Sequence, residues 1–302
     1  MPGSTPASAS PELPGGDLAL AGSSVGRALD RGAVLRRILR APAGLIGLSM
    51  TGVVAVVGLL APWLAPADPF AIDGPSLAAP SWDHPMGTDA LGRDLLSGVI
   101  HGARTAVIVA GATAVLVLGI GLLVGMVSGY AGGRVDDVLM RITEFFQVLP
   151  RFFMAIVVIA LFGPGIDRLV IVLGVTSWSL LARVVRAEVL SLREREFVEA
   201  ARADGAGPVR IMVRELLPNA FPSALVFVGL IVAQVLLIEA SLGFLGLGDP
   251  NAMSWGFLAS QAQQFLRVAW WLSVFPGLAI VFAVLGLNLL GDSLTDTGVT
   301  RT

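Results

Sequence analysis

Long apolar stretches separated by short polar segments constrain the fold of this chain more than any other feature. Hydrophobic residues make up 55% of the 302 positions and charged residues only 14%, and the mean hydropathy is +0.81. A soluble domain carries about 25% charged residues, so this balance indicates exposure to lipid. A helix needs about 20 mostly apolar residues to cross a bilayer. We therefore predict an all-α, polytopic membrane protein with six transmembrane helices. The predicted spans are residues 43–64, 103–129, 138–162, 167–187, 222–245 and 269–290.

Polar segments divide the rest of the chain. The N-terminal tail is rich in Pro, Gly, Ser and Ala, which predicts disorder. It does not resemble a secretory signal, because no short apolar run follows a basic start. The predicted organisation is a disordered tail at 1–26, a basic segment at 27–42, a transmembrane domain at 43–295 and a C-terminal tail at 296–302. Two long loops, 65–102 and 188–221, interrupt the transmembrane domain.

The placement of arginines predicts the orientation, because segments facing the cytoplasm carry an excess of positive charge. Fifteen arginines fall on one side of the predicted spans and four on the other. The fifteen are Arg27, Arg31, Arg36, Arg37, Arg40, Arg134, Arg141, Arg183, Arg186, Arg193, Arg195, Arg202, Arg210, Arg214 and Arg301. The four are Arg93, Arg104, Arg168 and Arg267. Both termini and loop 188–221 are therefore expected in the cytoplasm, with loop 65–102 outside.

Glycines and tryptophans suggest how the spans pack and sit in the bilayer. Gly121 and Gly125, one turn apart, predict a close contact between helices. Tryptophans near span ends are expected at the membrane interface, where amphipathic rings settle. These are Trp63, Trp255, Trp270 and Trp271.

Composition also excludes several kinds of chemistry. The chain has no Lys, and a phosphate-binding P-loop requires one, so any ATPase that drives this protein is expected on another chain. It has no Cys, and His84 and His101 are isolated, so we predict no metal site and no cofactor. No set of residues suggests catalysis, and the net charge of -2 implies no nucleic-acid partner. We predict a non-catalytic membrane protein.

The loop 188–221 has the pattern of two short helices joined by a turn. Good helix formers run up to Ala203, Gly205 and Gly207 fit a helix stop, and Pro208 fits the first turn of a second helix. Val209, Met212 and Val213 share a face of that second helix. The apolar face predicts either docking into a groove of a cytoplasmic partner or an amphipathic helix lying on the membrane.

Polar residues inside the predicted spans suggest a path through the protein. Glu239 lies within the fifth span, where a carboxylate must face protein or water rather than lipid. Gln234 lies close to the same face, and both are candidates for lining a pore or gate; a structural hydrogen bond between helices is the alternative for Glu239. In the third span, Glu144 and Arg151 share a face and are expected to pair through other groups.

The outer loop contains the polar run from His84 to Asp94. Asp89, Arg93 and Asp94 are candidates for contact with an extracytoplasmic binding protein. The alternative is a structured turn in which Pro and Gly set the bends and a carboxylate caps a helix.

An ordered series of motifs resembles one transporter family. Glu199-Ala200-Ala201, followed by Gly205, Ile211 and Leu217-Pro218, is similar to the EAA signature of binding-protein-dependent ABC importer permeases. Further motifs resemble the dipeptide/oligopeptide/nickel branch of this family. They are His84-Pro85-Met86-Gly87-Thr88-Asp89, Gly129-Tyr130, Ser177-Trp178, Glu239-Ala240-Ser241-Leu242-Gly243-Phe244-Leu245-Gly246-Leu247-Gly248 and Asn288-Leu289-Leu290-Gly291-Asp292. The resemblance covers about residues 40–295 and points to the C-type subunit. Glu215 departs from the family, which often has His there.

This resemblance implies a type I importer permease fold and a shared transport task. The EAA segment would be a coupling helix that contacts a separate ATPase through Glu199, Ala200, Ala201, Gly205, Ile211, Leu217 and Pro218. The implied partners are a second, B-type permease subunit, two ATPase subunits and an extracytoplasmic solute-binding protein, assembled in the lipid of the inner membrane.

The resemblance leaves the solute open. Dipeptides and oligopeptides are the expected cargo, and nickel or glutathione-like solutes are the alternative. A secondary transporter working alone is a further alternative; internal repeats and embedded ion-coupling residues would favour it.

Overall fold

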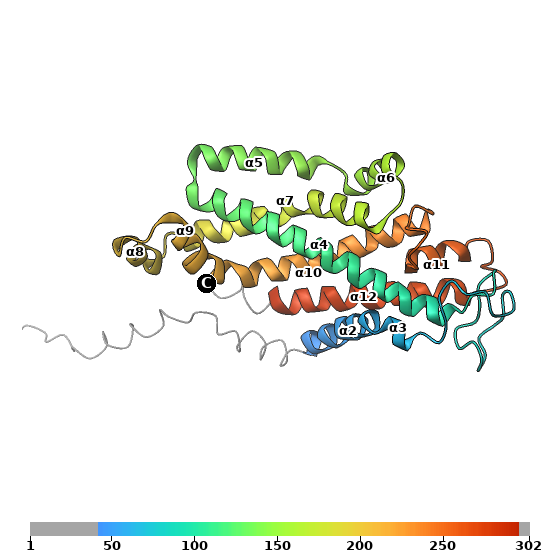
Figure 1. Cartoon of the computed structure of the whole chain (residues 1–302). Helices are drawn as coiled ribbons and strands as arrows, with labels where there is room; N and C mark the ends of the chain where they lie inside the picture. Colours follow the sequence, from blue (N-terminus) through green and yellow to red (C-terminus); the bar gives the residue numbers. More distant parts are fainter. Residues whose placement is uncertain (1–41, 296–302) are drawn as a thin grey trace, which may run out of the picture.

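The computed structural model describes residues 42–295, and its regular elements in that range are helices (Figure 1). In chain order they are α2 (Pro42–Leu59), α3 (Ala61–Leu64), α4 (Leu95–Ala131), α5 (Gly133–Val148), α6 (Arg151–Phe162), α7 (Ile166–Leu192), α8 (Glu196–Ala203), α9 (Pro208–Arg210), the π-helix η1 (Ile211–Leu216), α10 (Leu217–Phe244), α11 (Trp255–Ala262) and α12 (Trp271–Thr295). The predicted tails 1–26 and 296–302, and residues 27–41 of the basic segment, lie outside the described residues.

Five helices are long and apolar enough to cross a membrane, and a bent pair makes a sixth candidate. The five are α2, α4, α7, the continuous helix Pro208–Phe244 and α12. The pair is α5 with α6. This confirms the predicted all-α, polytopic fold. The long helices run side by side between two ends of the molecule (Figure 1). We call the end with α8 and α9 the hairpin end, and the end with residues 65–94 and α11 the loop end.

The predicted third span, 138–162, is not one continuous helix. Helices α5 and α6 meet at an angle of 77°. The break falls at Leu149-Pro150, where Leu149 has an extended backbone (φ -70°, ψ 121°). Proline disfavours the helical conformation in the residue before it and lacks the N–H that a continuing helix would use. The apolar run therefore folds as two helices.

The second predicted span and the outer loop meet at a different residue than expected. Helix α4 begins at Leu95 rather than near residue 103, so the loop ends at Asp94. The Asp94 carboxylate accepts hydrogen bonds from the backbone N–H of Ser97 (2.8 Å) and from its hydroxyl (2.7 Å). This is an N-cap, which satisfies donors that a helix start leaves free. The alternative in which an aspartate of this loop caps a helix is confirmed for Asp94.

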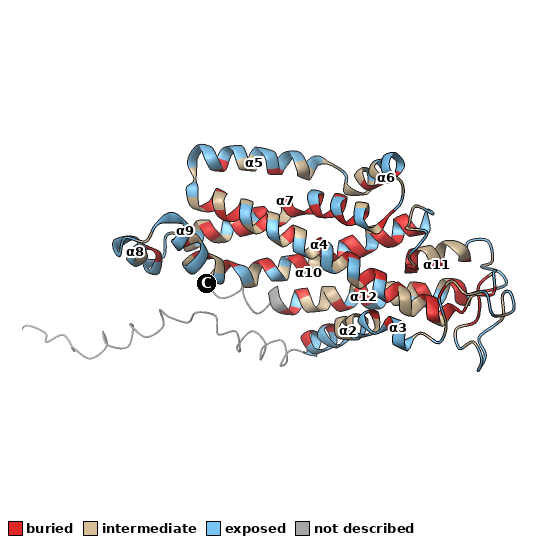
Figure 2. Ribbon diagram, in the orientation of Figure 1, coloured by how far each residue is buried: buried red, intermediate tan, exposed pale blue. Residues whose placement is uncertain are grey.

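Close packing of α4 against α7 forms the centre of the molecule. Gly121, Gly125 and Gly129 follow one another at one-turn intervals along α4 and face Leu181, Val185 and Val189 of α7. A Cβ atom at any of the three would come within 2.6–2.8 Å of its neighbours, which real Cβ atoms do not. The predicted small-residue contact is thus confirmed. Figure 2 shows buried residues concentrated along the inner helices, whereas much of α2 and α5 is exposed.

Two of the four tryptophans expected at the interface are instead inside the loop end. Trp255 and Trp271 are buried, and their indole N–H groups donate to the carbonyl oxygens of Val99 (2.9 Å) and Thr88 (3.1 Å). Trp63 and Trp270 are 78% and 53% exposed, which is consistent with a position at the membrane interface. Burial of Trp255 follows from α11, a short helix that the hydropathy pattern did not predict.

Replacing Asp94 with alanine should lower the stability of the protein. The change removes the N-cap of α4, so we expect the free energy of unfolding to fall by about 1–2 kcal/mol. Thermal unfolding of the purified protein in detergent measures the effect. Asp83→Ala is the matched control, since Asp83 is exposed in the same loop. Equal effects of the two changes would contradict the capping role.

Candidate functional site

A tight turn at the hairpin end joins α8 to the helix that begins at Pro208. Gly205 has φ +77°, in the left-handed region that favours glycine. The N–H of Gly205 donates to the carbonyl oxygen of Arg202, and the N–H of Ala206 to that of Ala201 (both 3.0 Å). These two bonds form a Schellman motif, which ends a helix and sets the direction of the following chain. The predicted helix stop at Gly205 is therefore present, and its geometry depends on that residue.

The second helix of the hairpin is the start of a membrane span rather than a separate element. Residues 208–244 form one continuous helix, with a π-helical stretch at 211–216. There the N–H of Leu217 donates to the carbonyl oxygen of Met212, five residues back. Pro218, which follows, has no N–H and its ring crowds the preceding turn, so the wider π-helical spacing precedes it. A rigid helix therefore connects the hairpin to the bilayer.

The apolar residues of the hairpin divide between the core and the surface. Val198, Ile211 and Leu216 are fully buried in the main hydrophobic core. Val209 and Val213 are 68% and 53% exposed. Met212, predicted to share their face, packs partly against the core. The hairpin thus holds itself to the bundle with one set of side chains and leaves another set free.

The predicted coupling residues occupy three different environments. Glu199, Ala200, Gly205 and Pro218 are exposed. Ala201 and Leu217 are partly buried against the core, and Ile211 is inside it. Ile211 therefore supports the hairpin from within the chain, and the exposed residues are the ones available to a partner.

Two arginines attach the hairpin end to the last turn of α4. The Arg193 guanidinium donates to the carbonyl oxygen of Gly129 (3.0 Å). The Arg202 guanidinium lies 5.9 Å from the ring centre of Tyr130, in cation–π geometry. Displacement of α8 would therefore act directly on α4.

A partly buried ion pair joins three helices close to the same end. Arg186 of α7 donates two hydrogen bonds to the carboxylate of Asp136 on α5, at 2.6 and 2.5 Å. The hydroxyl of Ser128 on α4 donates to the same carboxylate. Paired, parallel bonds of this kind fix geometry as well as adding energy. Asp136 was not among the predicted site residues; its only signal in the sequence was a carboxylate near arginines expected on the same side of the membrane.

At the loop end, the carboxylates predicted to contact a binding protein point inward. Asp89 is buried and accepts from the backbone N–H groups of Leu91 and Arg93 (both 2.8 Å). Asp94 is also buried, and His84 Nδ1 lies 3.2 Å from its carboxylate. Arg93 lies over the ring of Phe70. These contacts favour the alternative of a structured turn for this motif.

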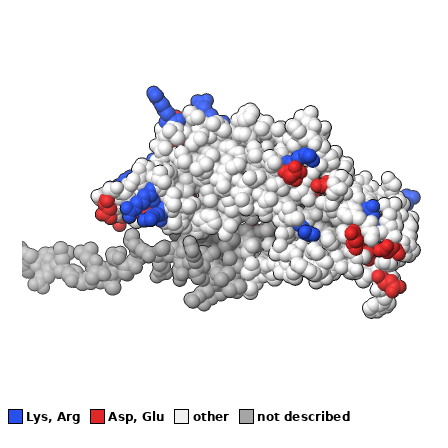
Figure 3. All heavy atoms as spheres, viewed as in Figure 1, with Lys and Arg blue, Asp and Glu red and all other residues white. Residues whose placement is uncertain are grey.

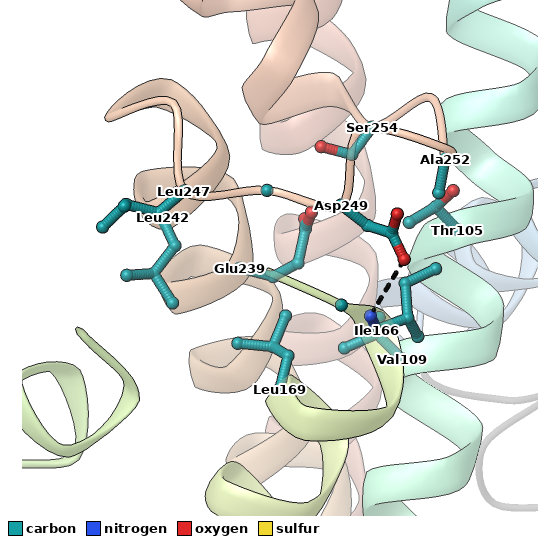
Figure 4. A pocket seen from close by; sticks show the side chains of 12 residues that line it. Thr105, Val109, Ile166, Leu169, Glu239, Leu242, Leu247, Asp249, Ala252 and Ser254 are labelled. Atoms are coloured by element: carbon teal, nitrogen blue, oxygen red, sulfur yellow. Dashed lines mark hydrogen bonds between the residues drawn. The ribbon is translucent and has the colours of Figure 1, made fainter. Parts of the chain in front are cut away.

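Glu239 lines a small cavity near the loop end (Figure 4). It is 6% exposed, and Ser254, just before α11, lines the same cavity. The unfilled space is about 330 Å³ including its opening, and Thr105 of α4, Ile166 of α7 and Asp249 also line it. Asp249 accepts from the backbone N–H of Ile166 (3.2 Å), at the start of α7. The burial of Glu239 among these groups agrees with the expectation that its carboxylate faces protein or water rather than lipid.

Gln234 and Glu239 do not share a face, contrary to prediction. Gln234 is exposed, whereas Glu239 is buried, because five residues along an α-helix correspond to a rotation of about 140°. Gln234 accepts a hydrogen bond from Nη1 of Arg151 (3.2 Å). Arg151 begins α6, beyond the break, so the expected common face with Glu144 on one straight helix is wrong.

Comparisons with known proteins identify related sequences. The family described as "Binding-protein-dependent transport system inner membrane component" matches residues 121–299. The chain is similar to the di/tripeptide transport system permease protein DppC of Pseudomonas aeruginosa, with 36% identity over 83% of this chain and 85% of the relative. It is 37% identical to the nickel transport system permease protein NikC of Escherichia coli K12, over 83% and 91%. A putative peptide permease of Brucella suis is 39% identical over 86% and 87%.

Removing the charge of Asp136 should destabilise the hairpin end. In Asp136→Asn the Arg186 guanidinium keeps a similarly shaped neighbour but loses its counter-ion, and we expect a loss of about 2 kcal/mol in the free energy of unfolding. Asp137→Asn, a change at the exposed neighbour, should alter stability by less than about 0.5 kcal/mol. Denaturation of the purified protein compares them, and an undiminished stability of Asp136→Asn would refute the structural role of the pair.

Proposed function

This chain belongs to the family of binding-protein-dependent transport system inner membrane components, and from that premise we propose that it moves peptides inward as one half of a translocation pathway. It is a multi-pass inner-membrane protein and a permease subunit of an ABC importer. The family implies partners that bind solute and hydrolyse ATP. We propose two ATPase subunits, a second permease subunit of the B type and an extracytoplasmic solute-binding protein, with no catalytic step on this chain.

We propose that the hairpin 196–217 contacts the ATPases. The main support is its turn at Gly205, which sets the direction of the second arm relative to the first. Its free surface combines exposed apolar side chains, Val209 and Val213, with charges of both signs. Figure 3 shows acidic and basic side chains side by side at this end. Apolar area supplies affinity in such a contact, and charges supply register and specificity.

The contacts behind that surface suit the transmission of a movement. Val198 and Ile211 anchor the two arms of the hairpin in the core. The second arm continues as the helix 208–244, and Arg202 stacks on Tyr130 of α4. Movement of a docked ATPase would therefore displace α4 and α10 as rigid elements.

The proposed orientation places the hairpin end and both termini in the cytoplasm. The arginine distribution supports it, because the described segment 193–214 at the hairpin end carries five arginines. The loop end then faces the binding protein. Since Asp89 and Asp94 are occupied inside the loop, Arg93 is the better placed of the three candidates for contact with that partner.

The proposed solutes are dipeptides or oligopeptides. Relatives named for di/tripeptides and for other peptides support this, with 36–39% identity. A nickel permease is equally similar at 37%, so transport of nickel is the second candidate. Glutathione-like solutes are a further variant of the peptide proposal.

Cross-linking of the assembled importer tests the docking proposal. The chain contains no Cys, so a single introduced thiol reports one position. We expect Val209→Cys to cross-link to an ATPase subunit. Ala79→Cys, exposed in the loop on the opposite end, should not. Cross-linking of position 79 to the ATPase, with none at 209, would reverse the proposed orientation.

A paired glycine substitution tests the coupling role of the turn. Valine at position 205 must adopt φ +77° at a cost of about 1–3 kcal/mol, or the turn must change. In Gly205→Val we expect ATP-driven peptide uptake to fall about tenfold or more. Gly207→Val is the control: Gly207 has φ -71°, and an added Cβ meets open space at both positions. If both variants transport normally, the turn is not the coupling element.

A further inference from the structure

Polar groups from four helices lie on the two sides of the break between α5 and α6. Arg151, the first residue of α6, donates to Gln234 of α10 (3.2 Å). Four residues earlier, Gln147 of α5 accepts from Arg183 of α7 (2.8 Å). Gln234 lies ten residues before the end of α10, which is about 15 Å along a helix. That distance is about half the thickness of the hydrocarbon core.

Lipid cannot cover this region. Each helix end leaves backbone groups without partners inside the helix, so the end of α5 and the start of α6 expose polar backbone at the break. In the hydrocarbon core, such non-helical backbone is tolerated only where protein covers it or where it lines a water-filled cavity. Gln234 and Arg183 are exposed, whereas Arg151 and Gln147 are half-buried, so the chain itself covers these pairs only in part.

Neither arginine has a counter-ion among the residues that the structure describes. In residues 42–295, no carboxylate lies within 4.0 Å of the guanidinium nitrogens of Arg151 or Arg183. Each guanidinium has five N–H donors and makes one of the hydrogen bonds described above. Glu144, one turn before Gln147 on α5, is exposed and does not outweigh two positive charges. Charged side chains within spans mark the paths of ions and solutes.

We propose that this region, the α5–α6 break with Arg151, Arg183, Gln147 and Gln234, is part of the wall of the translocation pathway and attracts the carboxylate of the passing solute. The proposal rests on the proposed function and narrows its substrate class. A guanidinium binds a carboxylate through paired hydrogen bonds. A peptide with a free C-terminus supplies that group, whereas two fixed positive charges repel a free divalent cation. Transport of peptides is therefore favoured over transport of uncomplexed nickel.

Thiol labelling of the reconstituted importer tests whether this region is open to water and whether it is positively charged. Gln234→Cys provides the only thiol of this chain. Its reaction rates with a sulfonate-bearing and a trimethylammonium-bearing methanethiosulfonate are compared, each normalised to a free thiol in solution. We expect the anionic reagent to be favoured about fivefold or more. The preference should disappear when Arg151→Gln is added.

Arg168→Gln is the matched control for the charge effect. Arg168 also donates through one nitrogen to a single oxygen, the carbonyl of Pro164, but lies at the loop end of α7. Adding it to Gln234→Cys should leave the preference unchanged. A thiol that reacts with neither reagent would show that protein or lipid covers the region. Reaction without charge preference would show that a partner's carboxylate neutralises the arginines. Either result overturns this proposal.

Measurements of peptide uptake distinguish a failure of this proposal from a failure of the proposed function. Arg151→Gln should reduce uptake of a dipeptide with a free C-terminus about tenfold, Arg151→Lys should restore most of it, and Arg168→Gln should have no effect. ATP hydrolysis stimulated by the loaded binding protein should persist in all three. Unchanged uptake in Arg151→Gln would overturn the role of the charge while the wild-type importer still moves peptide. If the wild type moves no peptide but the labelling preference holds, the proposed solute is wrong.

Discussion

Backbone hydrogen bonding in lipid is the constraint on which the rest of this structure depends. With no water available in the hydrocarbon core, each crossing segment must satisfy its own N–H and C=O groups, and the helix does this locally. The helices then pack through small residues, as at Gly121, Gly125 and Gly129, because the hydrophobic effect gives little drive for association between helices inside lipid. Departures from regular helix therefore stand out as places with a particular role.

Two such departures carry most of the functional argument. The π-helical stretch before Pro218 lets a single helix run from the hairpin into the bilayer. The break at Pro150 exposes polar backbone where only protein or water can cover it. The first suits the transfer of movement from a partner, and the second suits a wall beside the solute. They lie on elements linked by the bond between Arg151 of α6 and Gln234 of α10.

Polar residues of this chain serve two distinct purposes that look alike in the sequence. Asp136 with Arg186, and Asp89 with the backbone of its loop, are satisfied within the chain and hold helices or loops together. Arg151 and Arg183 have no such carboxylate partner among the described residues. A charge that is paired within the chain contributes to structure, whereas a charge within a span that has no counter-ion requires a partner, water or solute.

The sequence by itself determined the features that depend on local chemistry. Apolar length predicted the helices, Gly205 predicted the turn of the hairpin, and the small residues of α4 predicted a close contact. The tertiary structure alone decided which way polar and aromatic side chains face. It placed Gln234 outside and Glu239 inside, buried Trp255 and Trp271, and brought Asp136 to Arg186. Local hydrogen bonding and transfer to lipid act over a few residues, so a sequence reveals them. Burial and pairing depend on groups tens of residues away, as in the 83 residues between Arg151 and Gln234, so only the folded chain does.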